Sequence, residues 1–404
     1  MNPKLIPEVN IGLVGHVSHG KTTLTKALTG KLTLAHSEEL KRGITIRLGY
    51  ADVTIYKCTK CGKHSTNEKC IHCFSQAEPV RTVSFIDAPG HETLMATVLT
   101  GASLMDGAIL LVAANEKCPQ PQTREHLTAL EVVGIKNVII VQSKIDMVTR
   151  EQALENYNQI KEFVNGTSME NAPIIPISAQ YSVNLDYLFE AIEKVIPTPQ
   201  RDLEADPLMY VARSFDVNKP GSSPKALTGG IVGGSVVQGK FKVGDEIEIK
   251  PGVMVKSSYK PLTTIITGLK KGGMDLPEAG AGGLLGLMTD LDPALAKSDG
   301  LVGNVVGYPG KLLPPVINSL TLEIHLLERV VGAKELASTD PIKMNEPLLV
   351  NVGTSRSVGA VTSIKKGAVS LNLKIPICAT KQDRIVISRQ VQGRWRLVGY
   401  GKLL

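Results

Sequence analysis

The sequence has few aromatic residues, one tryptophan and no apolar run long enough to cross a membrane. Aromatics make up 4% of its 404 residues. The longest apolar runs, such as 108–114, are much shorter than the roughly 20 residues of a membrane-spanning helix. No apolar leader precedes the glycine-rich motif that starts at Gly15. We therefore expect a cytoplasmic protein that is neither secreted nor attached to a membrane.

Cysteine is also scarce, with six residues, and the charge excess is small. Without an export signal, metal ligation or free thiols are favoured over a disulfide framework. The 45 basic and 38 acidic residues leave a net charge of +7, which allows a polyanionic partner but does not define one. The chain is too long for one compact core, so two or three domains are expected.

Up to about residue 199, short apolar runs alternate with amphipathic segments. Such alternation predicts an α/β domain with a doubly wound, mostly parallel sheet, in which ligands bind at the carboxyl ends of the strands. We assign this domain to residues 1–203. The apolar runs are 9–14, 83–86, 108–113, 138–141 and 174–177, and the helical segments are 21–28, 92–100, 123–133, 151–164 and 185–195.

After Leu208 the chain changes to short alternating segments separated by glycine and proline. This texture predicts two small β-barrels, at 204–314 and 315–404, with the proline-rich stretch 312–316 between them. The expected strands are 210–215, 231–237, 242–249, 320–327, 348–352, 358–364, 369–373, 385–391 and 394–400.

A phosphate-binding loop is the strongest motif. Residues 15–22 read Gly-His-Val-Ser-His-Gly-Lys-Thr, which fits G-x-x-x-x-G-K-[ST] between an apolar strand and a helix. Backbone N–H groups of such a loop wrap phosphates, the lysine bridges the β- and γ-phosphates, and the last hydroxyl ligates Mg²⁺. The predicted nucleotide-binding residues are Val17, Ser18, His19, Gly20, Lys21, Thr22 and Thr23.

A second phosphate-side element, Asp-Ala-Pro-Gly-His, follows the strand 83–86. Asp87 is expected to hold magnesium through water, and Gly90 to bring its N–H to the γ-phosphate. His91 is predicted to orient the attacking water, although a lone histidine is more often structural or simply exposed.

The base-reading residues follow the next two strands. Asp146 can accept hydrogen bonds from the ring N–H and the amino group of guanine, a donor pair that adenine lacks. The stem of Lys144 can cover the base. Backbone N–H groups of Ser178, Ala179 and Gln180 are expected at the guanine oxygen. Together these loops predict a GTP/GDP site.

Four cysteines form two chelating pairs, Cys58-x-x-Cys61 and Cys70-x-x-Cys73, within 56–75. Four thiolates close a tetrahedral shell, which indicates a structural zinc knuckle. Iron in the same geometry and a pair of disulfides are the alternatives.

The phosphate loop, the segment 42–46 (Arg-Gly-Ile-Thr-Ile) and the segment 87–91 resemble translational GTPases of the elongation factor Tu class. Longer segments resemble, within that class, the gamma subunit of archaeal translation initiation factor 2. The resemblance implies three domains, a zinc knuckle, Thr45 as a magnesium-ligating switch threonine, and Val17 with Ile44 as a gate beside His91. The longer segments are 36–43, 48–51, 120–126, 213–221 and 327–332.

Two residues depart from the family pattern. Ser18 stands where many members carry an aspartate that, with the carbonyl of Gly43, belongs to a second magnesium site. Because a neutral hydroxyl is a weak ligand for a hard cation, we expect this second site to be poor. Ser143 replaces the asparagine of the base-reading motif, and its short hydroxyl is expected to lose a tie to the phosphate loop worth about 1 kcal/mol. Nucleotide affinity should then fall severalfold.

The resemblance implies a GTP-dependent carrier of initiator methionyl-tRNA to the small ribosomal subunit, acting as a heterotrimer with alpha and beta subunits. Hydrolysis should be slow unless activated. Tyr50 is a candidate stacking platform for the aminoacylated end of the tRNA. The alternatives are a selenocysteine-type elongation factor, disfavoured because no further domain follows Leu404, and a GTPase subunit or scaffold that docks a metabolic enzyme without RNA, disfavoured by the zinc knuckle.

Overall fold

In the computed structural model of the chain, residues 2–33, 45, 47–219, 221, 223, 227–311, 314–327, 339–365 and 367–404 are described. The chain divides into two compact units, each of which is described by itself. One unit comprises Met1–Pro199, Glu328–Thr339 and Val391–Val398. The other comprises Gln200–Leu327, Asp340–Gln390 and Gly399–Leu404.

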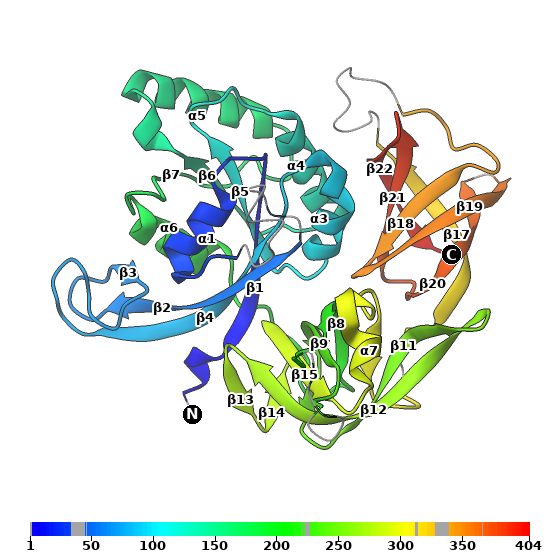
Figure 1. Ribbon diagram of the computed structural model, residues 1–404. Helices are drawn as coiled ribbons and strands as arrows, with labels where there is room; N and C mark the ends of the chain where they lie inside the picture. The colour runs from blue at the N-terminus through cyan, green and yellow to red at the C-terminus, as the bar shows by residue number, and fades with distance from the viewer. Residues whose placement is uncertain are drawn as a thin grey trace. The chain divides into compact units, whose positions relative to one another are not determined.

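A seven-stranded sheet forms the centre of the first unit, in the order β3-β2-β4-β1-β5-β6-β7 (Figure 1). The strands from β4 to β7 pair in parallel, whereas β2 pairs antiparallel with β4 and β3 antiparallel with β2. Strands β1 and β5 are apolar along nearly their whole length because helices cover the sheet. The strands are β1 (Pro7–Gly15), β2 (Gly49–Cys58), β3 (His64–Ser65), β4 (Ala77–Asp87), β5 (Gly107–Ala113), β6 (Val138–Ser143) and β7 (Ile174–Pro176).

The core of this unit lies between the sheet and two helices, α1 (Lys21–Thr29) and α6 (Leu185–Val195). Leu24 and Leu28 of α1 and Ile192 of α6 join the strand residues in one buried cluster. Helices α3 (Met95–Ala102) and α4 (Pro121–Val133) contact each other and also contact β1. The other helices among the described residues of this unit are η1 (Pro3–Leu5), η2 (Glu92–Leu94), η3 (Ile145–Met147) and α5 (Arg150–Val164). The predicted α/β fold class is thus confirmed.

The chain after residue 207 forms β-sheet structure. In the first barrel the sheet runs β11-β16-β8-β9-β15-β12-β13, and pairing of β11 with β12 closes it. Its strands are β8 (Leu208–Phe215), β9 (Ile231–Gln238), β11 (Glu246–Val255), β12 (Ser258–Lys271), β13 (Met274–Leu276), β15 (Leu284–Thr289) and β16 (Val305–Gly307). Beside it lie β10 (Lys240–Lys242), β14 (Glu278–Gly280), α7 (Pro293–Ala296) and η5 (Lys297–Asp299).

Six antiparallel strands form the second barrel, closed in the order β17-β20-β19-β18-β21-β22. Closure leaves no open sheet edge, which explains how strands with exposed alternate residues avoid pairing with other chains. They are β17 (Val316–Leu326), β18 (Pro347–Val352), β19 (Ser355–Lys365), β20 (Ala368–Cys378), β21 (Arg384–Val391) and β22 (Arg394–Leu403). The expectation of two barrels is confirmed.

Two element predictions were wrong in detail. The expected strand 242–249 is two strands, because Asp245 accepts a hydrogen bond from the Lys242 N–H at 2.8 Å and turns the chain between β10 and β11. The expected helix 92–100 starts with the 3₁₀ turn η2, and α3 begins only at Met95. No helix in the described part of the chain has the length and apolar composition needed to cross a lipid bilayer.

Candidate nucleotide site and cysteine cluster

The phosphate loop joins the end of β1 to the start of α1. Gly15 has φ 136°, and a Cβ there would lie 2.4 Å from the carbonyl oxygen of Leu111. Gly20, at φ 90°, precedes α1 without any described side chain capping the helix. The first N–H groups of α1 therefore stay available to an anion, and the helix dipole favours negative charge at that end.

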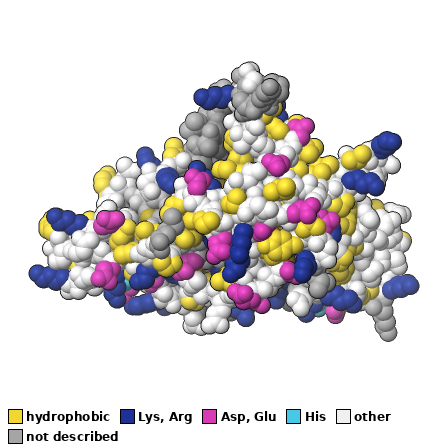
Figure 2. Space-filling model, turned by 90° about the horizontal axis from the view of Figure 1, so that it is seen from below, with side chains coloured by type: hydrophobic (Ala, Val, Ile, Leu, Met, Phe, Trp, Pro, Cys, Tyr) yellow, Lys and Arg dark blue, Asp and Glu magenta, His cyan; other side chains and the backbone are white. Residues whose placement is uncertain are grey.

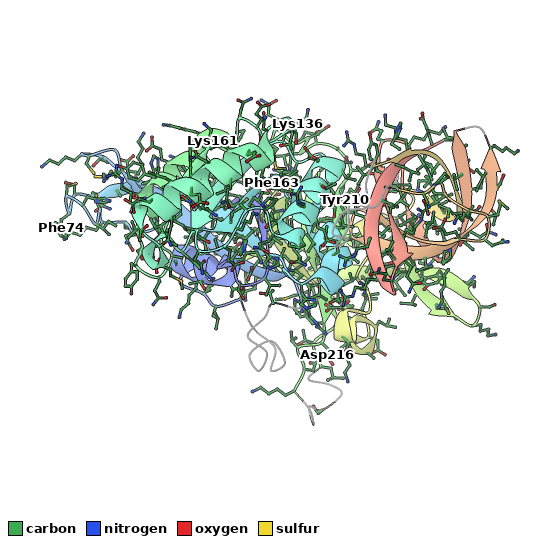
Figure 3. All side chains as sticks on the ribbon, turned by 90° about the horizontal axis from the view of Figure 1, so that it is seen from above. Phe74, Lys136, Lys161, Phe163, Tyr210 and Asp216 are labelled. Carbon is green, nitrogen blue, oxygen red and sulfur yellow. The ribbon has the colours of Figure 1, made fainter. Side chains whose placement is uncertain are left out.

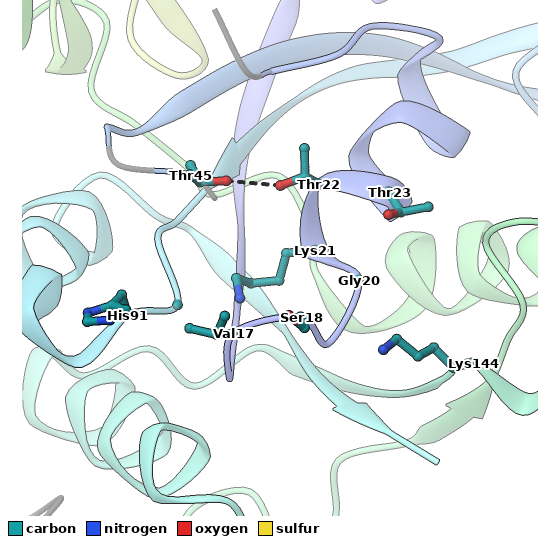
Figure 4. A pocket seen from close by; sticks show the side chains of 10 residues that line it. Val17, Ser18, Gly20, Lys21, Thr22, Thr23, Thr45, His91 and Lys144 are labelled. Atoms are coloured by element: carbon teal, nitrogen blue, oxygen red, sulfur yellow. Dashed lines mark hydrogen bonds between the residues drawn. The ribbon is translucent and has the colours of Figure 1, made fainter. Parts of the chain in front are cut away.

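Ten residues line a pocket around this loop (Figure 4). His91 lies on one side of the loop and Lys144 on the other. Every lining residue is one that the sequence predicts for the nucleotide site, and Lys144 and His91 come from loops more than 50 residues away. The ten are Val17, Ser18, Gly20, Lys21, Thr22, Thr23, Thr45, Gly90, His91 and Lys144.

Lys21 is buried and its ammonium group is bound by the loop itself. Nζ donates to the carbonyl oxygens of Gly15 at 2.9 Å and His16 at 2.6 Å. Burial lowers the pKa of Lys21 to about 8, against the opposing attraction of Asp87. A desolvated cation held only by carbonyl dipoles is well suited to receive phosphate oxygens.

Two buried histidines, His19 and His126, anchor the phosphate loop. The sequence analysis did not predict the role of His126. The N–H of Gly15 donates to Nδ1 of His126, on α4, at 2.7 Å. His19 is also buried, with Nδ1 3.0 Å from the Leu111 oxygen and Nε2 3.4 Å from Glu116. Burial lowers the pKa of His126 to about 3 and that of His19 to about 4, so both are neutral at physiological pH. The segment 120–126 contributed to the family resemblance, but nothing in it identified His126 as a loop anchor.

Three oxygen-bearing side chains fit a magnesium ion. The hydroxyls of Thr22 and Thr45 lie 3.0 Å apart, and Thr22 donates to Oδ2 of Asp87 at 2.8 Å. Oδ1 of Asp87 is buried and has no hydrogen-bond partner among the described residues. Since hydroxyl and carboxylate oxygens are the ligands that Mg²⁺ prefers, this donor set fits the ion. Ser18 is exposed in the pocket wall, whereas Gly43 and Ile44 lie outside the described residues, so the second magnesium site stays a prediction.

The segment after β4 approaches the phosphate loop very closely. A Cβ on Gly90 would lie 2.4 Å from Nζ of Lys21 and 2.9 Å from the backbone nitrogen of Val17. Only a glycine fits there, which keeps the segment after β4 against the phosphate loop. His91 is exposed and borders the pocket, with Nδ1 2.9 Å from the hydroxyl of Thr93. That bond leaves Nε2 as the ring nitrogen available to a water.

The predicted loss of contact between Ser143 and the phosphate loop was wrong. Its buried hydroxyl donates to the carbonyl oxygen of His19 at 2.7 Å, so the base-reading strand β6 keeps its tie to the phosphate loop. The short side chain reaches because His19 is held close to β5 through Leu111. The severalfold loss of nucleotide affinity stays a prediction.

The other base-reading residues lie at strand ends near Lys144. Asp146 is exposed on η3, and the Ile145 N–H donates to the Ile177 oxygen at 3.3 Å, which joins η3 to the following strand end. The Ser178 N–H donates to the Val183 oxygen at 3.3 Å, and Ala179 and Gln180 follow. Asp146, Ser178–Gln180 and Tyr50 do not line the pocket; Tyr50 lies on β2 opposite Ile86.

The four cysteines come together as predicted by their spacing. All four sulfurs lie within 4.8 Å of one another, with Cys58 and Cys73 at 3.4 Å and Cys61 and Cys70 at 3.5 Å. Backbone hydrogen bonds stabilise the thiolate form of two of the four: the N–H of Ser75 lowers the pKa of Cys73 to about 6, and the N–H of Cys61 lowers that of Cys58. Four thiolates without an open position fit a structural zinc ion.

The cysteine cluster is attached to α6 by charge. Lys63 donates to Asp186 at 3.1 Å, and Nε2 of His72 lies 3.6 Å from the same carboxylate. Phe74, directly after the last cysteine, has φ 59° and 72% exposure, and Figure 3 shows it at the far end of this region.

Over much of the face in Figure 2, basic and acidic side chains are interspersed, so the net charge is not gathered into one large basic patch there.

Comparison with known proteins gives consistent matches along the chain. Residues 7–198 match the elongation factor Tu GTP-binding domain, and residues 318–403 match the C-terminal part of initiation factor eIF2 gamma. Translation initiation factor 2 subunit gamma of Pyrococcus abyssi is 61% identical over 398 residues, 98% of this chain and 97% of the relative. The protein of that name from Methanocaldococcus jannaschii is 58% identical over 400 residues, with 98% and 97% coverage.

Solved structures share the fold. A bacterial selenocysteine-specific elongation factor, EF-Sec, matches with a TM-score of 0.75 and 25% identity, covering 98% of this chain and 58% of that chain. Elongation factor SelB from Methanococcus maripaludis, solved with the GTP analogue GppNHp, gives a TM-score of 0.72 at 22% identity, covering 98% and 79%. The identity to initiation factor subunits is more than twice as high.

Proposed function

We propose that this chain carries initiator methionyl-tRNA to the small ribosomal subunit while GTP is bound. It belongs to the gamma subunits of translation initiation factor 2 and has the GTPase domain of translational GTPases. The observation that supports this most strongly is the identity of about 60% that extends over 98% of the chain. It covers both the nucleotide domain and the β-barrels that follow it.

For nucleotide binding, we assign the phosphates to the loop 17–23, with Lys21 at the β- and γ-phosphates and the Gly90 N–H at the γ-phosphate. Thr22 and Thr45 would ligate magnesium directly, and Asp87 would hold one of its waters. When bound, the ion neutralises phosphate charge. Asp146 reads guanine, Lys144 covers the base, and Ser178, Ala179 and Gln180 offer backbone N–H groups to its oxygen.

His91 is assigned to orient the attacking water through Nε2, since Nδ1 is already bonded to Thr93. Intrinsic hydrolysis should be slow, on the order of 10⁻⁴ per second, until a partner completes the site. After hydrolysis the Thr45 contact to the γ-phosphate side is lost, which would release the switch segment and the tRNA.

Cys58, Cys61, Cys70 and Cys73 would hold zinc as a structural ion, stiffening the end of the sheet where β2 and β4 meet. The proposed partners are the alpha and beta subunits of the same factor, in the cytoplasm. Tyr50 is retained as a candidate contact for the aminoacylated tRNA end.

Protection of the methionyl ester tests the carrier role. Initiator methionyl-tRNA is incubated with the factor and its alpha subunit, with a non-hydrolysable GTP analogue or with GDP, and spontaneous ester hydrolysis is followed. Protection only with the analogue, and not of an elongator tRNA, is expected. Absence of protection in both nucleotide states, while GTP still binds tightly, would reject the carrier role and favour a GTPase that docks another protein.

A further inference from the structure

A third threonine hydroxyl reaches the carboxylate of Asp87, and no motif assigns it. Oγ1 of Thr33 donates to Oδ2 of Asp87 at 2.7 Å. This distance is as short as that from Thr22, and much shorter than the 3.5 Å from Thr45. Thr33 is 8% exposed and Asp87 is fully buried, so water does not compete strongly for this bond.

The neighbouring strand is shaped to admit Thr33. Gly49, on β2, is the register partner of Asp87 on β4. A Cβ at Gly49 would lie 2.6 Å from Cβ of Thr33, closer than two such carbons can approach. Any side chain at residue 49 would therefore displace Thr33 from Asp87.

The two oxygens of Asp87 are used very differently. Oδ2 accepts from Thr22, Thr33 and Thr45, whereas Oδ1 is buried without a partner in the described part of the chain. A buried carboxylate oxygen is costly unless something binds it. The bond from Thr33 thus fixes the carboxyl group in one rotation, with Oδ2 beside the hydroxyls of Thr22 and Thr45.

We propose that Thr33 is a positioning residue for magnesium: by donating to Oδ2 of Asp87, it holds the carboxylate beside Thr22 and Thr45, the proposed ligands of the ion. Thr33 does not itself line the nucleotide pocket, so it acts through Asp87. It also stands immediately before residues 34–44, and Thr45 stands immediately after them. These two residues, which flank the segment in the sequence, both contact the carboxylate of Asp87.

This inference rests on the proposed nucleotide role and is independent of tRNA binding. The bond from Thr33 could instead stabilise only the fold. The two roles differ in their dependence on magnesium: a fold contact would change nucleotide release with and without the ion, whereas a positioning contact would change it only with the ion.

The experiment follows release of a fluorescent GDP from the full chain as free Mg²⁺ is varied. Thr33→Val removes the hydroxyl and keeps the shape, Thr33→Ser keeps the hydroxyl, and Gly49→Ala displaces Thr33. Thr54→Val is the matched control. Thr54 lies on β2, the strand that carries Gly49, and the change breaks its 2.7 Å hydrogen bond to Thr82, away from Asp87. Melting temperatures of all variants are measured in parallel.

We expect the half-saturating Mg²⁺ concentration to rise about fivefold in Thr33→Val and in Gly49→Ala, the loss of one hydrogen bond. Combining the two changes should add little, because both remove the same contact. Thr33→Ser and Thr54→Val should behave like the wild type, and release without magnesium should be unchanged.

An unchanged magnesium dependence in Thr33→Val, or an equal change with and without the ion, would overturn the inference. If Thr33→Val does not fold, Gly49→Ala decides by the same criterion. If wild-type protein shows no magnesium-dependent GDP binding, the proposed nucleotide role fails, which is a different result from an unchanged variant.

Discussion

Acidification should weaken the fold of the nucleotide domain through its buried histidines, most clearly through His126. Nδ1 of His126 accepts the Gly15 N–H, so a proton on that nitrogen would break the bond and place a charge in a buried site. Burial holds the pKa of His126 at about 3, against an ordinary value of 6.5. The unfolded chain therefore binds more protons than the folded chain between these values. Stability is fully present above pH 6.5 and is lost as the pH falls toward 3.

The loss of stability at pH 5 depends little on the pKa of His126 in the folded chain, because that pKa lies well below pH 5. From the ordinary value to pH 5 is about 1.5 pH units, and about 1.4 kcal/mol per unit gives about 2 kcal/mol for one histidine. His19, with its pKa lowered to about 4 mainly by burial, should add a similar amount. A loss of about 4 kcal/mol is large beside a typical stability of 5–15 kcal/mol.

The assay compares wild type with His126→Asn, whose side-chain oxygen can accept from Gly15 but does not titrate near neutral pH. Unfolding is measured by calorimetry near pH 7 and pH 5, in buffers of different ionisation enthalpy, which reports proton uptake. Wild type should take up about one proton more than the variant at pH 5 and lose about 2 kcal/mol more between the two pH values. Equal proton uptake in both proteins would refute a neutral, buried His126.

The remaining predictions concern the base, the base–loop tie and the metal. Asp146→Asn should shift nucleotide preference from GTP to XTP, because an amide can donate to the oxygen that replaces the guanine amino group. A competition assay between the two nucleotides measures this preference. An unchanged preference would show that Asp146 does not contact the base. Ser143→Ala should weaken GDP binding about fivefold, because it leaves the His19 carbonyl oxygen without the 2.7 Å hydrogen bond from Ser143. Ser143→Asn should change GDP affinity little. Equal affinities of wild type and Ser143→Ala would contradict the role of this bond. Cys61→Ser should lower the zinc content from one ion per chain. A chelator should lower the melting temperature of wild type but not that of the variant. A variant that keeps its zinc would indicate a different set of ligands.

Much of the fold could be predicted because its signals are local. Apolar runs and amphipathic segments located β1, β4, β5, β6 and β7 and the longer helices of the nucleotide domain, and α6 was predicted with its observed bounds, whereas β2 and β3 were not among the predicted strands. The strand expected at 242–249 failed because a side-chain bond from Asp245 makes a turn that alternation of residue types does not reveal. The pairing of β2 with β4, which brings Gly49 beside Asp87, also follows from tertiary structure and not from periodicity.

In the site, motif residues were predictable and their supports were not. The residues of the loop have fixed spacing, Gly90, His91 and Lys144 lie in motifs that follow strands, and Thr45 was implied by the family resemblance, so the ten pocket residues could be named from sequence. Thr33 and His126 carry no motif, and each acts on a residue at least 54 positions away. Ser143 was misjudged because the length of a side chain was compared with the family pattern, without knowing how near His19 would lie.

The phosphate loop is held mainly by groups that carry no charge at neutral pH. His126 and Ser143 bind its backbone, and the ring of the loop residue His19 binds the Leu111 oxygen on β5; all three are neutral, so they add no cation that would compete for the ligand. Lys21 is a buried ammonium on the loop, bound by two carbonyl oxygens and attracted by Asp87. Phosphate oxygens would replace part of its lost hydration and raise its pKa again. The nucleotide-free loop is therefore the less stable form, and bound GTP or GDP should stabilise the domain in proportion to the logarithm of ligand concentration.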